Sequence, residues 1–269
     1  MSPKCLDTSA VPGLEARSVH KRFDGRVVLQ GVDLSVDRGL VTILLGANGS
    51  GKSTLIRCLT GLERIDAGEV WVAGERTDGL RGSDLRRSRR RVAVVFQQFN
   101  IIGNVSVFQN VLNGAMGRVP FGVLGVLAPL APGRLREKAM YCLARVGLAD
   151  RADHPARTLS GGQQQRVAIA RALMQEAEVV IADEPVASLD PEAGRAVMDL
   201  LVTVAREDGM AVLVSLHQLG LVEQYGDRTV GLKAGRVDFD TRFEAVPRDR
   251  MEALYLEDAV AQTSLEDSA

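Results

Sequence analysis

The 269-residue sequence is poor in cysteine and contains no long apolar run. Its three cysteines, Cys5, Cys58 and Cys142, are odd in number, widely separated and form no CxxC pair. This argues against a disulfide framework and is typical of a reducing compartment. No stretch reaches the roughly 18 uninterrupted apolar residues of a membrane-spanning helix. The N-terminal residues include one lysine but no apolar signal-peptide segment. We therefore expect a chain that does not itself cross a membrane.

Net charge and internal repetition are also low. The formal charge is −1, so whole-chain electrostatics favour neither nucleic acid nor an anionic membrane as partner. No period of 20–50 residues recurs, which excludes a solenoid. A local exception is the basic run 86–91, which contains five arginines around Ser88. We interpret it as a solvated helix face or a contact with lipid headgroups beside a membrane partner, and not as a nucleic-acid site.

Strand-like and helix-like patterns alternate along the chain, which predicts an α/β core. Residues 14–19 and 27–36 alternate as antiparallel strands do, whereas 40–45 is a continuous apolar run typical of a strand buried on both faces. A less regular middle region, about residues 99–158, is predicted to be an inserted helical lobe. Further strands are expected at 69–72, 92–96, 179–182, 211–216, 229–232 and 236–239, and helices at 52–61, 83–91, 134–146, 162–174, 191–206 and 250–256.

A glycine-rich loop follows the apolar run 40–45 and precedes a predicted helix. It matches the P-loop pattern G-x4-G-K-[ST], in which the glycines let backbone amides turn towards phosphate oxygens. Lys52 is expected to contact the β- and γ-phosphates, and the Ser53 hydroxyl to bind Mg²⁺. The sequence thus predicts an ATP site with Mg²⁺, made by Gly46, Ala47, Asn48, Gly49, Ser50, Gly51, Lys52, Ser53 and Thr54.

Two acidic residues end the apolar strand predicted at 179–182. Carboxylates at the carboxyl end of a buried strand lie where α/β sheets bind ligands. We expect Asp183 to hold Mg²⁺, directly or through water, and Glu184 to act as general base on the attacking water. The alternative is an acidic start to a loop.

Residues 159–163, Leu-Ser-Gly-Gly-Gln, offer a second phosphate cradle. A hydroxyl and two unhindered glycine amides at a helix start can hold a phosphate. One nucleotide does not need two cradles from one chain, so we infer that each copy offers this segment to a nucleotide held by another copy. The alternative, a capping serine before a helix, explains Ser160 but neither glycine.

The longer segment 159–173 resembles the signature segment of the ATP-binding cassette (ABC) family. The resemblance covers about residues 14–240. It implies a P-loop NTPase (RecA-like) core with an antiparallel β subdomain and an inserted α-helical subdomain, preceded by a flexible leader at 1–13 and followed by a C-terminal helix and tail at 241–269. It also implies that the γ-phosphate on the opposite protomer is contacted from the segment made by Ser160, Gly161, Gly162 and Gln163.

Other motifs of the family occur in its usual order. Gln97 resembles the Q-loop glutamine that senses Mg²⁺ and couples to the membrane partner, with Gln98 as its alternative. Asp190 resembles the D-loop residue at the dimer seam. His217 resembles the switch histidine at the γ-phosphate, where a structural or solvated histidine is the alternative. Phe23 resembles the aromatic residue that stacks on adenine, and its alternative is a core position.

Within the family, the residues around Gln98, Ala187-Ser188 and Gln218 are similar to those of phosphonate-import ATPases, a lineage shared with phosphite and hypophosphite importers. This implies a second copy of the chain, two membrane permease subunits and a periplasmic or surface substrate-binding protein, at the cytoplasmic face of the inner membrane. Residues 117–133 are either a docking surface for the permease or a core loop. The alternatives are an importer of another small solute, a signalling or repair ATPase, and a P-loop kinase.

Overall fold

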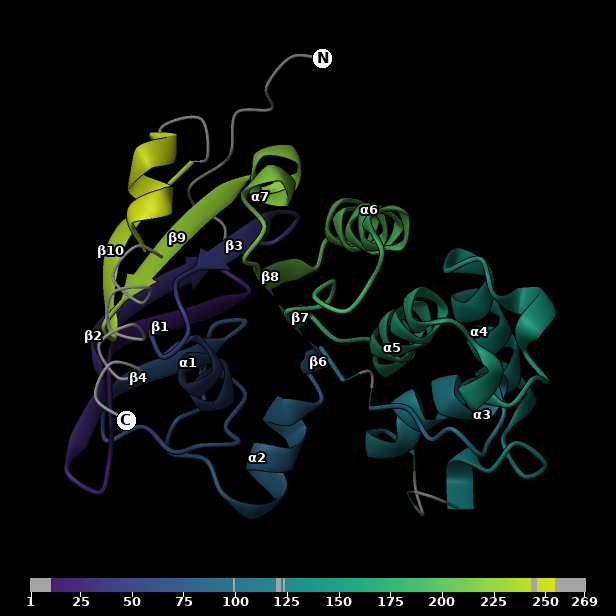
Figure 1. Cartoon of the computed structure of the whole chain (residues 1–269). Helices are drawn as coiled ribbons and strands as arrows, with labels where there is room; N and C mark the ends of the chain where they lie inside the picture. The colour runs from purple at the N-terminus through teal and green to yellow at the C-terminus, as the bar shows by residue number, and fades with distance from the viewer. Residues whose placement is uncertain (1–10, 99, 120–121, 123, 243–245, 255–269) are drawn as a thin grey trace, which may run out of the picture.

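A computed structural model describes residues 11–98, 100–119, 122, 124–242 and 246–254. Two sheets lie side by side, and a helical lobe extends from one of them (Figure 1). Most of the predicted leader (1–13) and the predicted tail after 254 lie outside the described residues. In the part of the chain that is described, none of the helices is long and apolar enough to traverse a bilayer.

The larger sheet has the strand order β10-β9-β3-β8-β7-β6. Its five strands from β9 to β6 run parallel, and β10 closes one edge antiparallel to β9. Every residue of β3 and β8 is buried, and for β3 the continuous apolar run 40–45 predicted this. The strands are β3 (Val41–Leu45), β6 (Val92–Phe96), β7 (Val179–Asp183), β8 (Ala211–Ser215), β9 (Arg228–Lys233) and β10 (Arg236–Thr241).

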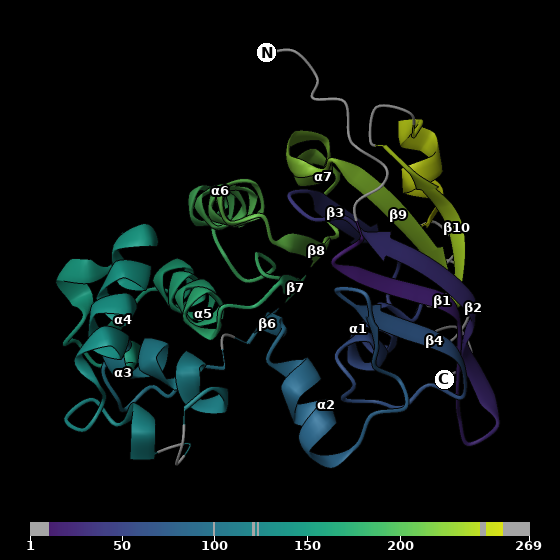
Figure 2. The same ribbon diagram turned by 180° about the vertical axis from the view of Figure 1, so that it is seen from behind.

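Alternate residues of these strands feed two separate hydrophobic clusters. In β7, Val180 and Ala182 join the cluster that contains α5 and α6, whereas Val179 and Ile181 join the one that contains α1. Helices α1 and α5 therefore pack on opposite faces of the sheet, as Figure 2 also shows. The helices are α1 (Lys52–Leu59), α5 (Gly161–Gln175), α6 (Pro191–Asp208) and α7 (Leu219–Tyr225).

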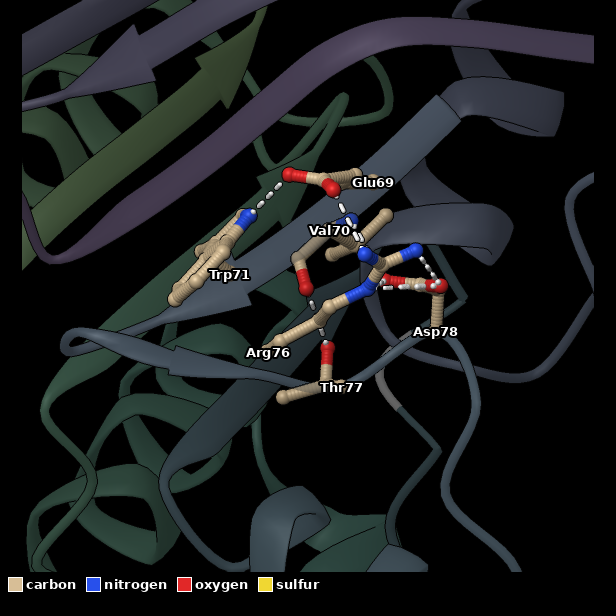
Figure 3. Close-up of polar contacts among 6 residues, drawn as sticks. All are labelled: Glu69, Val70, Trp71, Arg76, Thr77 and Asp78. Atoms are coloured by element: carbon tan, nitrogen blue, oxygen red, sulfur yellow. Dashed lines mark hydrogen bonds and ion pairs between the residues drawn. The ribbon is translucent and has the colours of Figure 1, made fainter. Parts of the chain in front are cut away.

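The smaller sheet is antiparallel, with strand order β2-β1-β4-β5. It comprises β1 (Leu14–Phe23), β2 (Arg26–Val36), β4 (Ala67–Val72) and β5 (Glu75–Arg76). Strand β1 runs four residues beyond its predicted end at 19, and β5 was not predicted because two residues carry no periodic pattern. A polar network fixes the β4–β5 hairpin: Arg76 binds Glu69 and Asp78, and the indole of Trp71 donates to Glu69 (Figure 3).

The lobe consists of α3 (Val107–Leu112), α4 (Gly133–Arg145) and short 3-10 turns, including one at Asn113–Gly117. Helix α5 packs against α3 and α4 and also contacts β6 and α6, so it joins the lobe to the sheet. Between β5 and β6 lies the basic helix α2 (Gly82–Arg89). In the segment 117–133, Val126 is buried while Leu124 and Leu130 are exposed, so the described part has both core and surface character.

Element boundaries agree with the predicted ones to within a few residues. Strand β6 coincides with the predicted 92–96, and α6 extends the predicted helix 191–206 by two residues. The predicted helix 250–256 begins two residues earlier, at 248, and the rest of it lies outside the described residues.

Candidate functional site

The candidate site lies at the carboxyl edge of the parallel sheet. The register places Leu44 of β3, Ser215 of β8, Asp183 of β7 and Phe96 of β6 in one row across four neighbouring strands. In α/β folds, ligands bind outside this edge. The residues at and just after these four strand ends are therefore neighbours. They are the loop that starts at Gly46, the pair Asp183 and Glu184, His217, and Gln97.

The glycine loop has a backbone shape that larger residues would not adopt. Gly46, Gly49 and Gly51 have φ values of +153°, +78° and +107°. A Cβ on Gly46 would lie 2.4 Å from the carbonyl oxygen of Leu232 and 2.6 Å from Ser50 Oγ. The loop therefore requires glycine for both conformation and space, as a cradle of backbone amides does.

Polar groups inside this loop suit a phosphate. Lys52 is 5% exposed, and its Nζ donates to the carbonyl oxygens of Gly46 at 2.6 Å and Ala47 at 3.0 Å. The hydroxyl of Ser50 is buried and has no hydrogen-bond partner among the described residues. No acidic residue occupies the first turn of α1, so its N-terminal N–H groups can attract an anion. Ser53 is exposed at the start of this helix.

Two strand ends converge on the acidic pair. Ser215 Oγ donates to Asp183 Oδ1 at 2.7 Å and accepts from the backbone N–H of Glu184 at 2.8 Å. Glu184 adopts a left-handed φ of +50°, and its Oε1 contacts Nε2 of His217. The histidine is thus neither a core nor a fully solvated residue, and it faces the carboxylate that was predicted to be the base.

This donor set fits Mg²⁺ held partly by substrate. Mg²⁺ in phosphate sites is typically bound by one or two protein oxygens together with phosphate oxygens and water. Asp183 and the Ser53 hydroxyl can supply those protein oxygens. Among the described residues, no cluster of three or more His, Cys, Asp or Glu side chains forms an all-protein metal site.

Gln97 and Gln98 follow β6, and both are exposed. Exposure therefore does not distinguish between them as the Q-loop glutamine. They line a surface cavity of about 450 Å³ together with Asn100, Ile101, Gln164 and Ser188. Next in the chain to Gln164 is a residue that the sequence did not single out. Gln165 is fully buried, and its amide donates to the carbonyl oxygens of Phe96 and Pro185 at 3.1 and 2.8 Å.

The segment 159–163 begins α5. The Ser160 hydroxyl and the Gln163 side chain form a reciprocal capping box, so the alternative role of Ser160 as a helix cap is realised here. Gly162 packs closely on the start of α6, since an added Cβ would lie 2.8 Å from Cβ of Ala193. Asp190 caps α6 by accepting from two backbone N–H groups of its first turn.

Phe23 ends β1 and is 41% exposed, so the alternative of a core position is wrong. The ammonium of Lys21 lies 4.7 Å from its ring centroid. Lys21 is itself paired with Glu63 at 2.7 Å. The Phe23 ring is therefore an exposed ring at the end of β1 that is in contact with a cation.

Comparison with known proteins agrees with this geometry. The ABC transporter family model matches residues 29–187. The chain is 49% identical to a phosphate-import ATP-binding protein of Mycolicibacterium smegmatis, over 89% of this chain and 90% of that protein. It is 46% identical to a phosphonates import ATP-binding protein of Nocardia farcinica (93% and 92% covered). It is 43% identical to a hypophosphite import ATP-binding protein of Stutzerimonas stutzeri (90% and 70% covered).

A solved structure with the same fold is a bacterial ABC transporter cassette determined as a dimer, with a TM-score of 0.74, 32% identity, and coverage of 87% of this chain and 100% of that one. The family match spans more than half of the chain and includes the glycine loop, the signature segment and the acidic pair. The chain therefore belongs to the ABC transporter family, and it is an ABC-type ATPase.

Proposed function

We propose that this ATPase energises the import of phosphonates or related phosphorus oxyanions. The support is the similarity to proteins named for phosphate, phosphonate and hypophosphite import over about nine-tenths of the chain. All of these solutes are small phosphorus oxyanions. The residues Gln98, Ala187-Ser188 and Gln218 favour the phosphonate branch within that class.

In the proposed mechanism, the glycine loop and Lys52 bind the triphosphate, and Phe23 stacks on the adenine. Lys52 would exchange its two carbonyl acceptors for phosphate oxygens, which are stronger acceptors because they are charged. Mg²⁺ bound by Ser53 and Asp183, and sensed by Gln97, would neutralise charge on the β- and γ-phosphates.

Glu184 is the proposed general base. Its carboxylate follows the strand end that carries Asp183, and His217 holds its Oε1 by a direct contact. A base held in this way can orient the attacking water and accept its proton. The observation that carries the proposal is the row of four strand ends, because it gathers the P-loop, both acids and the histidine at one edge.

A second copy of the chain is the proposed partner at the nucleotide. Helix α5, which begins at the signature segment, packs on the opposite sheet face from α1, which begins at the P-loop. This separation supports the idea that Ser160, Gly161, Gly162 and Gln163, with Asp190, act on the nucleotide of the other protomer. ATP bound between protomers would then favour the closed dimer over the open one.

We infer that two permease subunits and an external substrate-binding protein complete the transporter. The chain would sit peripherally at the cytoplasmic face of the inner membrane. The cavity lined by Gln97 and Gln98, between the sheet and the lobe, is the proposed contact point with the permease. ATP-driven closure of the dimer would be passed to the permease there.

The ATPase part of the proposal is tested with Glu184→Gln. This variant should bind ATP, lose hydrolysis and accumulate as a dimer by light scattering. A monomer under saturating ATP would contradict the mechanism.

A matched pair of variants then tests the role of the signature serine. Ser106 also caps a helix, α3, through its hydroxyl, so Ser160→Ala and Ser106→Ala lose similar caps, but only the former should abolish hydrolysis. A P-loop kinase would need neither serine.

The solute is tested by deleting the gene and growing cells on methylphosphonate, phosphite, hypophosphite or phosphate as sole phosphorus source. Loss of growth on methylphosphonate alone supports the phosphonate assignment. Loss on another oxyanion reassigns the solute within the same class. Normal growth on all four, in a strain without a redundant system, would contradict the import of phosphorus oxyanions. The remaining roles would then be import of another class of solute or a function outside transport.

A further inference from the structure

Ser215, the last residue of β8, lies between the two acids of the proposed site. Its side chain is fully buried, and the parallel register sets it directly opposite Asp183 of β7. Its hydroxyl makes two hydrogen bonds, as donor to Asp183 Oδ1 at 2.7 Å and as acceptor from the Glu184 N–H at 2.8 Å. One side chain therefore contacts both the predicted Mg²⁺ ligand and the backbone of the predicted general base.

The first bond restricts Asp183. A carboxylate with one oxygen bound to a fixed hydroxyl cannot rotate freely about its last side-chain bond. The orientation of the remaining oxygen is then set before any ligand arrives. Hydrogen bonds of this kind orient metal ligands from outside the coordination shell.

The second bond restricts Glu184. This residue has a φ of +50°, a left-handed conformation that non-glycine residues rarely adopt. Its N–H points at Ser215, and with that turn fixed its carboxylate reaches His217. Backbone outliers of this kind persist only where neighbouring groups hold them.

We propose that Ser215 is a positioning residue that sets the Mg²⁺ ligand and the general base in one geometry. This inference rests on the proposed roles of Asp183 and Glu184. Ser215 does not touch the reacting atoms and acts through those two residues. A purely structural role, in which the hydroxyl only satisfies a buried N–H, would affect stability without affecting the response to Mg²⁺.

The experiment compares Ser215→Ala and Ser215→Cys with the wild type. Cysteine keeps a similar shape but is a weak hydrogen-bond donor and acceptor, so it serves as a second variant if alanine prevents folding. Thr42→Val is the matched control. Thr42 is fully buried on the adjacent strand β3, and its hydroxyl has no hydrogen-bond partner among the described residues.

Two measurements are made: ATP hydrolysis as a function of Mg²⁺ concentration, and binding of a fluorescent ATP analogue with Mg²⁺ or with EDTA. We expect the Ser215 variants to lose about 10–100-fold in kcat or in apparent Mg²⁺ affinity, the usual effect of removing such a partner. Binding of the analogue in EDTA should be unchanged, and the gain in affinity on adding Mg²⁺ should shrink. Thr42→Val should match the wild type in both measurements.

A wild-type kcat and Mg²⁺ response in either Ser215 variant would overturn the proposal, whatever the melting temperature. An equal loss of analogue binding with and without Mg²⁺ would also overturn it, because that result indicates general damage to the nucleotide site. Failure of the proposed function is separate: the wild-type protein itself would then not hydrolyse ATP, or would hydrolyse it without transporting the solute.

Discussion

Gln165 gives the sharpest test of how α5 supports the site. Its amide nitrogen donates to the carbonyl oxygens of Phe96 and Pro185, which stand one residue before Gln97 and one after Glu184. The substitution Gln165→Leu keeps the approximate shape of the side chain and removes both hydrogen bonds. We predict a loss of stability together with a loss of turnover.

The magnitude follows from the burial of these groups. Each lost bond leaves a carbonyl oxygen without that donor, which costs roughly 1–3 kcal/mol. Part of this is offset because the Gln165 Oε1 is buried and has no hydrogen-bond partner among the described residues. The net change in the free energy of unfolding is then about 2–4 kcal/mol, and the Tm falls by roughly 5–10 °C for a chain of this size. A displacement of Gln97 or Glu184 by even part of an ångström should lower kcat by about 10–100-fold, with little change in KM.

The control is at the other end of the same helix. Gln175 donates from its amide to the carbonyl oxygens of Arg89, Arg90 and Val92, away from the sheet edge that carries the site. Gln175→Leu should lower the Tm in a thermal melt and leave kcat unchanged in a coupled ATPase assay. Wild-type turnover in Gln165→Leu would refute the reasoning. An equal fall of kcat in both variants would show that turnover follows stability and not position.

Three further predictions concern the rest of the molecule. Arg145 of α4 forms a bidentate pair with Asp208 at the end of α6, with N–O distances of 3.1 and 2.9 Å. A double-mutant cycle should therefore give a coupling energy of about 0.5–1 kcal/mol that shrinks in 1 M NaCl. A coupling energy of zero at low salt would contradict this prediction. Burial raises the pKa of the Cys58 thiol to about 11, so iodoacetamide at pH 8 should modify it only after unfolding, as read by mass spectrometry, and rapid modification of the native protein would be the contrary result. Burial opposes ionisation of Glu178, but hydrogen bonds from Arg91 and a second arginine lower its pKa overall. Its stabilising effect is therefore present above the unfolded pKa of about 4.3 and lost as the pH falls through the folded value, so urea midpoints at pH 7 and pH 3.5 should differ more in the wild type than in Glu178→Gln; equal differences would exclude this residue as a source of acid sensitivity.

The positions of Gln97 and Asp183 could be predicted because each lies at the end of a strand with a strong apolar pattern. Residues 92–96 and 179–182 are continuous apolar runs, and the structure turns them into β6 and β7 with Gln97 and Asp183 at their ends. Parallel strands share one carboxyl edge, so a linear pattern was enough to group these residues. The predicted helices 134–146 and 191–206 were found for a similar reason, since their apolar spacing has a clear helical period.

The supporting residues could not be predicted, because their roles depend on pairing between distant segments. Ser215 is significant only through the β7–β8 register that sets it opposite Asp183. Gln165 lies in a run of three glutamines that pattern analysis treats as polar surface, yet it alone of the three is fully buried. The residue type and its position in the helical period do not show which carbonyl oxygens of distant segments a side chain will bind.

These two residues together explain how separate segments can act as one site. Ser215 ties the end of β8 to the end of β7, and Gln165 ties α5 to the ends of β6 and β7. Both links are made by fully buried side chains, where a broken hydrogen bond is not replaced by water. Helix α5 also carries the lobe. A movement of the lobe relative to the sheet must therefore either break the bonds of Gln165 or carry Phe96 and Pro185 with it. The second course moves the residues next to Gln97 and Glu184, so we expect a movement of the lobe to change the geometry of the proposed base.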